Sequence, residues 1–485
     1  MGVLSDLRPR AVFRFFEELC AIPHGSHNTR AVSDYITAFA KARGLKFRQD
    51  ELNNVIIWKG PTAGYENAPT VMIQGHMDMV AEKEAGCVKD MEREGLDLFV
   101  DGDLVGARGT TLGGDDGIAV AMALAILDAE DLQHGPLECL FTVDEEVGML
   151  GARGLDTSDL NAKYMLNLDS EKEKVFTVSC AGATRAVCTL PVSRAAFTGA
   201  VLRLTVDGLA GGHSGEEIHK GRANANILMG RALAGLMNVT DLRLLTVKGG
   251  AKDNAIPREA SALLTVRDPQ AAEAAVRTLG AALANEYRAA DGGIQVKLTT
   301  AERGGSDSPR PPMDEDSTRR VAAFLFCAPN GVQMMSAEVP GLVQTSLNLG
   351  QVGAEGGAFV ARFLIRSSVD SQAAEITEKV VTLTKALGGV VDIPASYSAW
   401  PYRPDSHLRD VMTEAFRAVY HEEPKIEALH AGLECGILSG KMPELDCISF
   451  GPDLTDIHTP RERLHIASTE RTWRLTLEAL KRLKY

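Results

Sequence analysis

The chain has 485 residues, of which 45% are hydrophobic and 24% are charged, as in globular proteins with buried cores. This length is too great for one ordinary core, so we expect two or more domains. The net charge of −14 argues against a nucleic-acid partner, which would require a basic surface.

The sequence contains no good candidate for a membrane or signal segment. The longest apolar run, 118–127, is too short to cross a bilayer. Residues 10–20 follow an amphipathic helical pattern with interspersed charges, unlike a signal peptide. The eight cysteines show no C-x-x-C pair and no disulfide spacing, so we expect reduced thiols. We therefore predict a cytoplasmic protein with no membrane partner.

The first part of the chain alternates strands and helices. The predicted elements are helices over 10–20, 29–43 and 117–129, and strands over 70–73, 137–143 and 164–168. The strands are continuously apolar and the helix over 117–129 is apolar on nearly every side, which indicates an α/β sheet covered on both faces. The pattern returns near residue 400, with a helix over 405–419, a strand over 447–450 and a final helix over 468–483.

The middle of the chain has a different order of elements. Residues 201–298 predict β-α-β-β-α-β, and after a Pro-rich break at 308–312 much of that order recurs over 318–394. The letters Asp-x-Gln-Ala-Ala-Glu also recur, from Asp268 and from Asp370. Two explanations remain open: an internal duplication, or a common helix start in which Asp serves as the N-cap.

The fold class is therefore α/β, with a discontinuous catalytic domain built on a mixed sheet covered by helices. We assign residues 1–187 and 398–485 to this domain. Residues 188–397 form an inserted α+β lid domain of two ferredoxin-like halves.

Five short segments, far apart in the chain, carry acidic and histidine side chains. They are His76-Met77-Asp78, Gly113-Gly114-Asp115-Asp116-Gly117, Asp144-Glu145-Glu146, Asn167-Leu168-Asp169-Ser170-Glu171 and Ile457-His458-Thr459-Pro460. Side chains at the carboxyl ends of strands converge on one crevice of an open α/β sheet. Two histidines and three or more carboxylates are the ligands required by two Zn²⁺ ions that share a water.

Some individual roles follow from position. In an extended chain His76 and Asp78 point the same way, so Asp78 can take the second ring N–H of a metal-bound His76. Asp115 is the expected bridging ligand, although an Asp before a helix is also a good N-cap. Asp116 has no assigned role and is itself a candidate for that cap.

Asp144-Glu145-Glu146 follows a strand, and three adjacent carboxylates repel one another unless cations lie among them. Neighbouring side chains of a strand face opposite sides. One of Glu145 and Glu146 should therefore bind metal while the other removes a proton from the water. The residues alone do not say which.

The order of these segments resembles the co-catalytic di-zinc aminopeptidase, carboxypeptidase and aminoacylase family. Within it, the chain is most similar to the aminoacyl-histidine dipeptidases, also called cytosol non-specific or carnosinase-like dipeptidases. The resemblance covers essentially the whole chain. It is carried by residues 75–80, 110–113, 144–148, 211–215 and 430–436.

This resemblance implies a role for each site residue. His76 and Asp169 would hold one Zn²⁺, Glu146 and His458 the other, and Asp115 would bridge them. Asp78 would orient His76, and Glu145 would be the general base. Mn²⁺ or Co²⁺ would suit the same ligands. The family often has Ala-Asp where this chain has Gly114-Asp115, and we expect no effect on metal binding.

The resemblance also implies substrate contacts from the inserted domain. His213 would donate to the tetrahedral oxyanion, Asn254 and Gly432 would contact the substrate, and Arg366 would pair with a free carboxylate. Some relatives have half as much lid and use the histidine of a partner subunit. The suspected duplication suggests that His213 acts within its own chain. Whether the chain forms a homodimer is left open.

The predicted activity is metal-dependent hydrolysis of L-dipeptides, including Xaa-His substrates similar to carnosine. An N-acyl amino acid deacylase or a carboxypeptidase of the same family is the alternative. A metal-binding scaffold without catalysis is disfavoured, because Glu145 and every ligand are present. A di-metal phosphatase would require basic phosphate-binding loops, which the sequence does not show.

Overall fold

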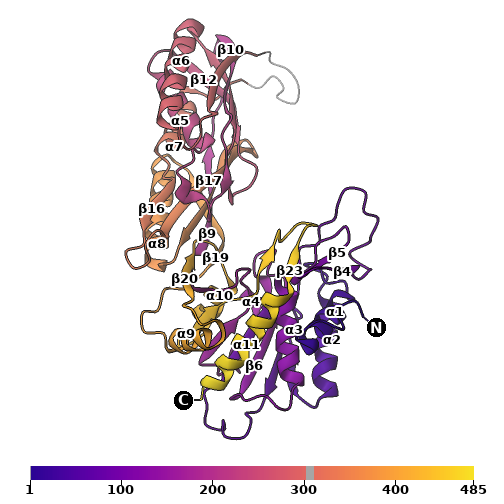
Figure 1. Ribbon diagram of the computed structural model, residues 1–485. Coiled ribbons are helices and arrows are strands. Elements are labelled where there is room, and N and C mark those ends of the chain that lie inside the picture. Colours follow the sequence, from indigo (N-terminus) through magenta and orange to yellow (C-terminus); the bar gives the residue numbers. More distant parts are fainter. Residues whose placement is uncertain (1, 302–310, 485) are drawn as a thin grey trace. The chain divides into compact units, whose positions relative to one another are not determined.

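The computed structural model describes residues 2–301 and 311–484, so most of the Pro-rich segment 308–312 lies outside the described residues. The chain divides into two compact units (Figure 1). Unit 1 contains the described residues of 1–180, 400–428 and 433–485, and unit 2 those of 181–399 and 429–432. Among the helices described, none is both long enough and apolar enough to cross a membrane.

Unit 1 is built on an eight-stranded mixed sheet. In spatial order its strands are Lys46–Gln49 (β1), Val55–Lys59 (β2), Leu137–Thr142 (β6), Val71–His76 (β3), Tyr164–Asn167 (β7), Asp446–Ser449 (β21), Val175–Cys180 (β8) and Lys425–Leu429 (β20). The centre is parallel, since β3 pairs with β6 and β7, and β7 pairs with β21. Every residue of these four strands is buried, so both faces of the central sheet are covered. The predicted α/β class is confirmed.

Seven helices and a small second sheet complete the described part of unit 1. The helices are Arg10–Cys20 (α1), Arg30–Ala42 (α2), Gly114–Asp128 (α3), Leu150–Gly154 (α4), His407–Tyr420 (α9), Glu434–Lys441 (α10) and Ile466–Arg482 (α11). The second sheet contains Leu454–Thr455 (β22), Arg463–His465 (β23), Leu104–Ala107 (β5) and Leu98–Asp101 (β4). The apolar helix α3 is buried over residues 114–127 and lies in the main core.

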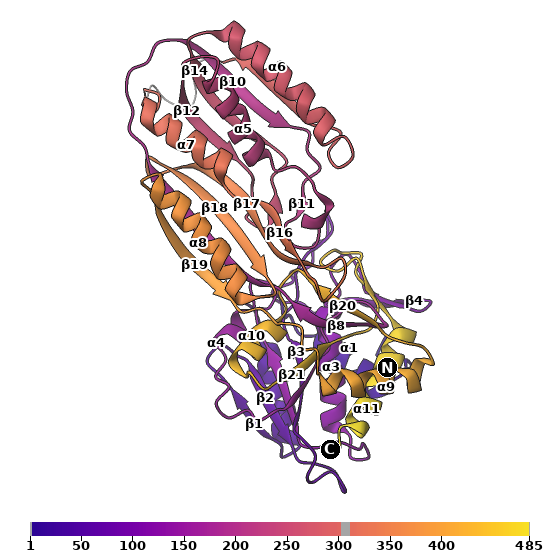
Figure 2. The same cartoon turned by 90° about the vertical axis from the view of Figure 1, so that its left-hand side faces the viewer.

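Unit 2 is built on a nine-stranded sheet. The strands are Gln295–Thr300 (β15), Ala200–Asp207 (β10), Ala260–Val266 (β14), Leu242–Gly249 (β12), Val343–Glu355 (β17), Ala358–Ser367 (β18), Gly182–Pro191 (β9) and Val390–Tyr397 (β19), with Gly331–Met335 (β16) paired to β17. One face of the sheet is lined by helices Ala225–Met237 (α5), Pro269–Glu286 (α6), Glu315–Cys327 (α7) and Asp370–Ala386 (α8). Figure 2 shows α8 lying along β18 and β19. A short 3-10 helix (Ile218–Lys220) and the two-stranded sheet of Gly212–His213 (β11) and Ala255–Ile256 (β13) lie outside these layers.

The sheet of unit 2 contains the same strand order twice. The strands β15-β10-β14-β12 have the 4-1-3-2 order of a β-α-β-β-α-β motif, and β19-β9-β18-β17 have it again. The first strand of the second motif, β9, precedes the whole first motif in the chain, and it crosses the expected boundary between 187 and 188. Asp268 is the N-cap of α6, but the N-cap of α8 is Val369 and not Asp370. Two equivalent Asp caps therefore do not explain the recurring letters.

Candidate functional site

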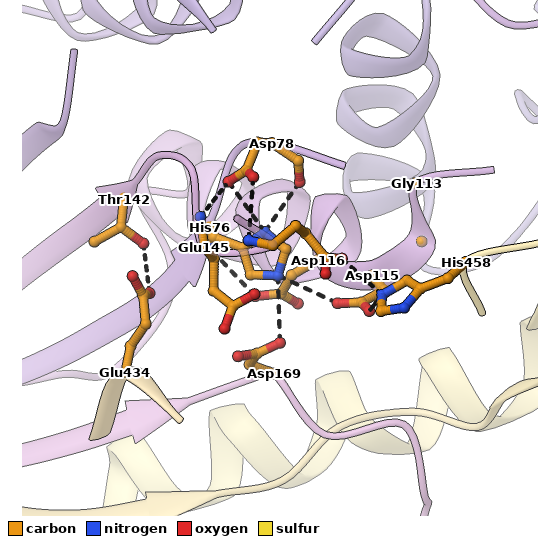
Figure 3. Close-up of polar contacts among 12 residues, drawn as sticks. His76, Asp78, Gly113, Asp115, Asp116, Thr142, Glu145, Asp169, Glu434 and His458 are labelled. Carbon is orange, nitrogen blue, oxygen red and sulfur yellow. Dashed lines mark hydrogen bonds and ion pairs between the residues drawn. The ribbon is translucent and has the colours of Figure 1, made fainter. Parts of the chain in front are cut away.

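The acidic and histidine segments of unit 1 lie at one edge of its sheet (Figure 3). His76 ends β3, Glu145 and Glu146 follow β6, and Asp169 follows β7. Since these strands are parallel, their carboxyl ends lie at the same edge. His458 comes from a loop between β22 and β23, and Asp115 from the start of α3.

Asp115 lies between two imidazoles. Its Oδ1 is 3.2 Å from His76 Nε2, and its Oδ2 is 3.2 Å from His458 Nε2. Each histidine has one further carboxylate: Asp169 Oδ1 lies 3.5 Å from His76 Nε2, and Glu146 Oε1 lies 2.8 Å from His458 Nε2. The cluster thus has two halves that share one carboxylate.

These donors fit a pair of metal ions. Within the described residues, the ion pairs of Asp115, Glu146 and Asp169 are all with histidines and none is with Lys or Arg. Hydrogen bonds that the His458 ring donates to Asp115 and Glu146 raise the pKa of His458 to about 10. Burial raises the pKa of Asp169 to about 6. So much negative charge beside two imidazoles calls for cations, and this donor set suits Zn²⁺.

Asp78 does more than the sequence predicted. His76 Nδ1 is 3.0 Å from the main-chain carbonyl oxygen of Asp78 and 3.5 Å from its carboxylate, so the carbonyl is the closer acceptor. The Asp78 carboxylate instead accepts from the Ser26 hydroxyl (2.9 Å) and from the main-chain N–H groups of Glu145 (3.0 Å) and Glu146 (3.4 Å). One residue therefore orients the ring of His76 and holds the loop of the two glutamates.

Glu145 and Glu146 lie beyond the end of β6, in a loop that begins a turn. The argument that strand neighbours face opposite sides was therefore wrong for this pair. The loop places Glu146 Oε1 2.8 Å from His458 Nε2. Glu145 lies near His76, as Figure 3 shows. Burial raises the pKa of Glu145. A second contact holds the loop at Asp144, which has φ of 54° and accepts from the main-chain N–H of His27 at 2.6 Å.

Neither Asp115 nor Asp116 is the N-cap of α3; both lie in its first turn, where their φ and ψ are not helical. The N-cap position is Gly113, with φ of 67°, and no side-chain cap bond is formed there. Asp116 is buried and accepts from the main-chain N–H of His76 at 3.3 Å. A Cβ on Gly75 would lie 2.6 Å from Asp116 Oδ2, so residue 75 must be glycine. Asp116 supports the end of β3, a role that the sequence did not indicate.

The residues expected to contact substrate form a second cluster, within unit 2. His213 pairs with Ala255 between β11 and β13, and Ser214 N–H donates to the Asn254 carbonyl at 2.9 Å. A Cβ on Gly215 would lie 3.1 Å from His213 Cε1 and 3.2 Å from Arg366 Nε. His213, Asn254 and Arg366 are thus neighbours.

Gly432 and His430 belong to the same unit. A Cβ on Gly432 would lie 2.8 Å from Tyr397 Cζ, so a larger residue there would require the tyrosine ring to shift. His430 is buried, and its Nε2 is 2.7 Å from the hydroxyl of Ser346, which lies opposite Arg366 in the β17–β18 pairing. Burial and the charge of Arg366 lower the pKa of His430 to about 3. From the sequence, this histidine had no assigned role within the motif at residues 430–436.

Comparison with known proteins then identifies the family. The model of "Peptidase family M20/M25/M40" matches residues 72–482. The chain belongs to this family. As a member of the M20/M25/M40 peptidases it is an enzyme that hydrolyses peptide bonds, and the resemblance predicted from the sequence is confirmed.

Individual M20/M25/M40 relatives match over the full length. The chain is 37% identical to the cytosol non-specific dipeptidase of Escherichia coli K12, over 100% of this chain and 99% of that protein. It is similar to the crystal structure of aminoacylhistidine dipeptidase from Vibrio alginolyticus, with a TM-score of 0.91, 35% identity, and 99% and 97% of the two chains covered. Aminopeptidase PepT from Bacillus cereus shares the fold, with a TM-score of 0.55, 15% identity, and 99% and 100% coverage.

Proposed function

We propose that this protein is a dipeptidase that uses two zinc ions. The observation that carries the proposal is Asp115, which offers one oxygen to each of two histidines. His76 and Asp169 would bind one ion, and Glu146 and His458 the other. The names and the full-length similarity of the two dipeptidases support the substrate class.

The two ions, when bound, would polarise the scissile carbonyl and make water a stronger nucleophile. Glu145 lies beside His76 without an ion-pair partner among the described residues, and it would take the proton of the attacking water and deliver it to the leaving amine. Asp78 would orient the His76 ring and keep the Glu145 main chain in place through the 3.0 Å hydrogen bond.

The cluster of unit 2 would bind the rest of the dipeptide. His213 would donate to the oxyanion of the tetrahedral intermediate, and the Arg366 guanidinium would pair with the substrate's free carboxylate. Asn254 and the main chain at Gly432 would complete this contact. The expected substrates are L-dipeptides, including Xaa-His dipeptides similar to carnosine, and the expected location is the cytoplasm. The same ligands would also suit Mn²⁺ or Co²⁺ in place of Zn²⁺.

A panel of substrates tests this proposal. The purified protein is stripped with a chelator, reloaded with Zn²⁺, Mn²⁺ or Co²⁺, and assayed on L-dipeptides, tripeptides and N-acetyl amino acids. We expect hydrolysis of dipeptides only after metal is restored. Hydrolysis mainly of N-acetyl amino acids would instead establish the deacylase alternative, and release of single C-terminal residues from longer peptides would establish a carboxypeptidase.

The carboxylate contact has its own control within that assay. Each good dipeptide is compared with its C-terminal amide, in the wild type and in Arg366→Ala. We expect Arg366→Ala to raise KM for the free acid and to leave the already weak amide almost unchanged. An equal loss on both substrates would show that Arg366 does not bind the carboxylate.

A further inference from the structure

Glu462 lies four residues after His458 and was not singled out by the sequence. Its side chain is buried, with 2% of the residue exposed. The carboxylate accepts four main-chain N–H groups, two at each oxygen. Oε2 accepts from Leu112 (2.7 Å) and Gly113 (3.1 Å), and Oε1 accepts from Gly114 (2.8 Å) and Asp115 (3.3 Å).

These four N–H groups lie in the turn that leads into α3, in which Asp115 and Asp116 have non-helical φ and ψ and no side-chain N-cap bond is formed. A buried carboxylate at this turn satisfies main-chain N–H groups that would otherwise be buried without an acceptor. Glu462 accepts these hydrogen bonds although it lies 347 residues after Asp115 in the sequence. It thus joins the two metal-binding segments that are not at the end of a main-sheet strand.

The two halves of the metal cluster are supported differently. His76 is the last residue of β3, Asp116 holds its N–H, and Asp169 lies two residues after β7. His458, by contrast, lies in a loop with φ of 59°, and its side chain is 44% exposed. Glu462 is the buried anchor at the carboxyl end of that loop.

From this arrangement we infer that Glu462 is a positioning residue that sets Asp115 and His458 relative to each other. It therefore controls the affinity for the ion at Glu146 and His458 more than for the ion at His76 and Asp169. The inference rests on the proposed two-metal function. It concerns a residue that touches neither ion nor substrate and acts through two residues that do.

The matched control is Glu138 on β6, which is also 2% exposed and also accepts main-chain N–H groups. The Glu138 carboxylate accepts from the main-chain N–H groups of Asn161 (2.9 Å) and Ala162 (3.1 Å), which do not belong to the metal-binding segments. Glu462→Gln and Glu138→Gln therefore make the same chemical change in the same unit. Both substitutions put an amide NH₂ group in place of a carboxylate oxygen that accepts main-chain hydrogen bonds. Both should therefore lower the midpoint temperature of thermal unfolding.

The measurement is a titration of the metal-free full-length protein with Co²⁺, followed by calorimetry and by the d–d absorption of the bound ion. The wild type should bind two ions. Glu462→Gln should bind one ion almost normally and the other roughly 10- to 100-fold more weakly, which is the usual effect of losing a residue that supports a metal ligand. Glu462→Asp, which keeps the charge, should retain more of this affinity. Glu138→Gln should bind both ions as the wild type does.

Hydrogen exchange of the metal-free protein gives a readout that needs no ion. The amides of residues 112–115 should exchange faster in Glu462→Gln and Glu462→Asp but not in Glu138→Gln. If Glu462→Gln binds both ions with wild-type affinity, or if its affinity for both ions falls equally, the inference about Glu462 is wrong. The proposed function would still stand in either case. A wild-type protein that binds no Co²⁺ would contradict the proposed function, and the inference with it.

Discussion

The Asp78 carboxylate and the main chain of His27 hold the same short loop from two sides. Asp78 accepts from the N–H groups of Glu145 and Glu146, and Asp144 accepts from His27. Fixing the backbone in this way lets two adjacent glutamates have different surroundings. Glu146 contacts His458 at 2.8 Å, whereas Glu145 has no ion pair among the described residues.

Glu145→Gln should separate metal binding from proton transfer. The amide is nearly the same size but cannot accept the proton of the water, and general acid–base catalysis is worth about 10²–10⁴-fold. We expect kcat to fall by that factor while two ions remain bound. Glu146→Gln, the neighbouring control, should lose metal instead. A Glu145→Gln protein with near-normal kcat and two ions would show that another group is the base.

His430 should make unit 2 less stable in acid. Its pKa is about 3 in the folded protein and 6.5 when unfolded, because burial and Arg366 disfavour the charged ring. Between pH 6.5 and 3 the unfolded chain therefore binds the proton first, so stability is lost as the pH falls through this window. Each unit of pKa difference corresponds to about 1.4 kcal/mol, so the total loss is a few kcal/mol.

His430→Gln removes this titration and should flatten that part of the pH profile. Hydrogen exchange of β17 and β18 amides at several pH values reports the stability of unit 2. The neighbours Arg366, His213 and His219 remain in the variant and provide a common background. His421→Gln, at an exposed position of unit 1, is the control. Identical pH profiles for the wild type and His430→Gln would contradict the account of this buried histidine.

The metal-site residues could be anticipated because their chemistry is visible in the sequence. His76, Glu146 and Asp169 are charged or imidazole side chains at the ends of apolar strands, where function is expected. Glu462 and Asp116 could not be assigned, because their partners are main-chain N–H groups from residues distant in sequence. Sequence spacing carries no information on such contacts.

Helices α5 and α7 approach each other closely at one glycine. A Cβ on Gly230 would lie 2.5 Å from the main-chain nitrogen of Phe326, whereas a Cβ on Gly235 of the same helix would meet nothing within 4 Å. Gly230→Ala should therefore lower the free energy of unfolding by about 1–3 kcal/mol through overpacking. Gly235→Ala should raise it by up to about 1 kcal/mol, since alanine is the better helix former.

Chemical denaturation of the two alanine variants measures this difference. Because the substitutions are identical and lie in one helix, the intrinsic helix propensity cancels between them. Equal stabilities for Gly230→Ala and Gly235→Ala would show that the contact of α5 with α7 is not tight.

The central strands β3, β6 and β7 of unit 1 were predictable because buried strands are continuously apolar, and they lie near the expected residues. The strands β1, β2, β8 and β20 of the same sheet were not identified. The strand β9 was not identified. Its sequence, GATRAVCTLP, mixes small, polar and apolar residues without a continuous apolar run, and its partners β18 and β19 come more than 150 residues later in the chain. A strand whose pairing is so distant gives little local signal.

Residues from both ends of the chain build the metal cluster, and residues of the intervening unit 2 are proposed to complete the substrate contacts. If each chain provides its own His213, mixing the inactive His213→Ala and Glu145→Gln proteins should not restore activity. The measurement is dipeptide hydrolysis after prolonged incubation of the mixture, with each variant alone as control. Restored activity would mean that His213 serves the site of a partner subunit.

Two metal ions are proposed to act together in one site of each chain. Titrating metal-free protein with Zn²⁺ while measuring both bound metal and dipeptide hydrolysis tests it directly. The account predicts that full activity requires two ions per chain, and that His458→Ala binds at most one ion tightly and remains inactive. Full dipeptidase activity in protein that contains no metal, or only one ion per chain, would contradict it.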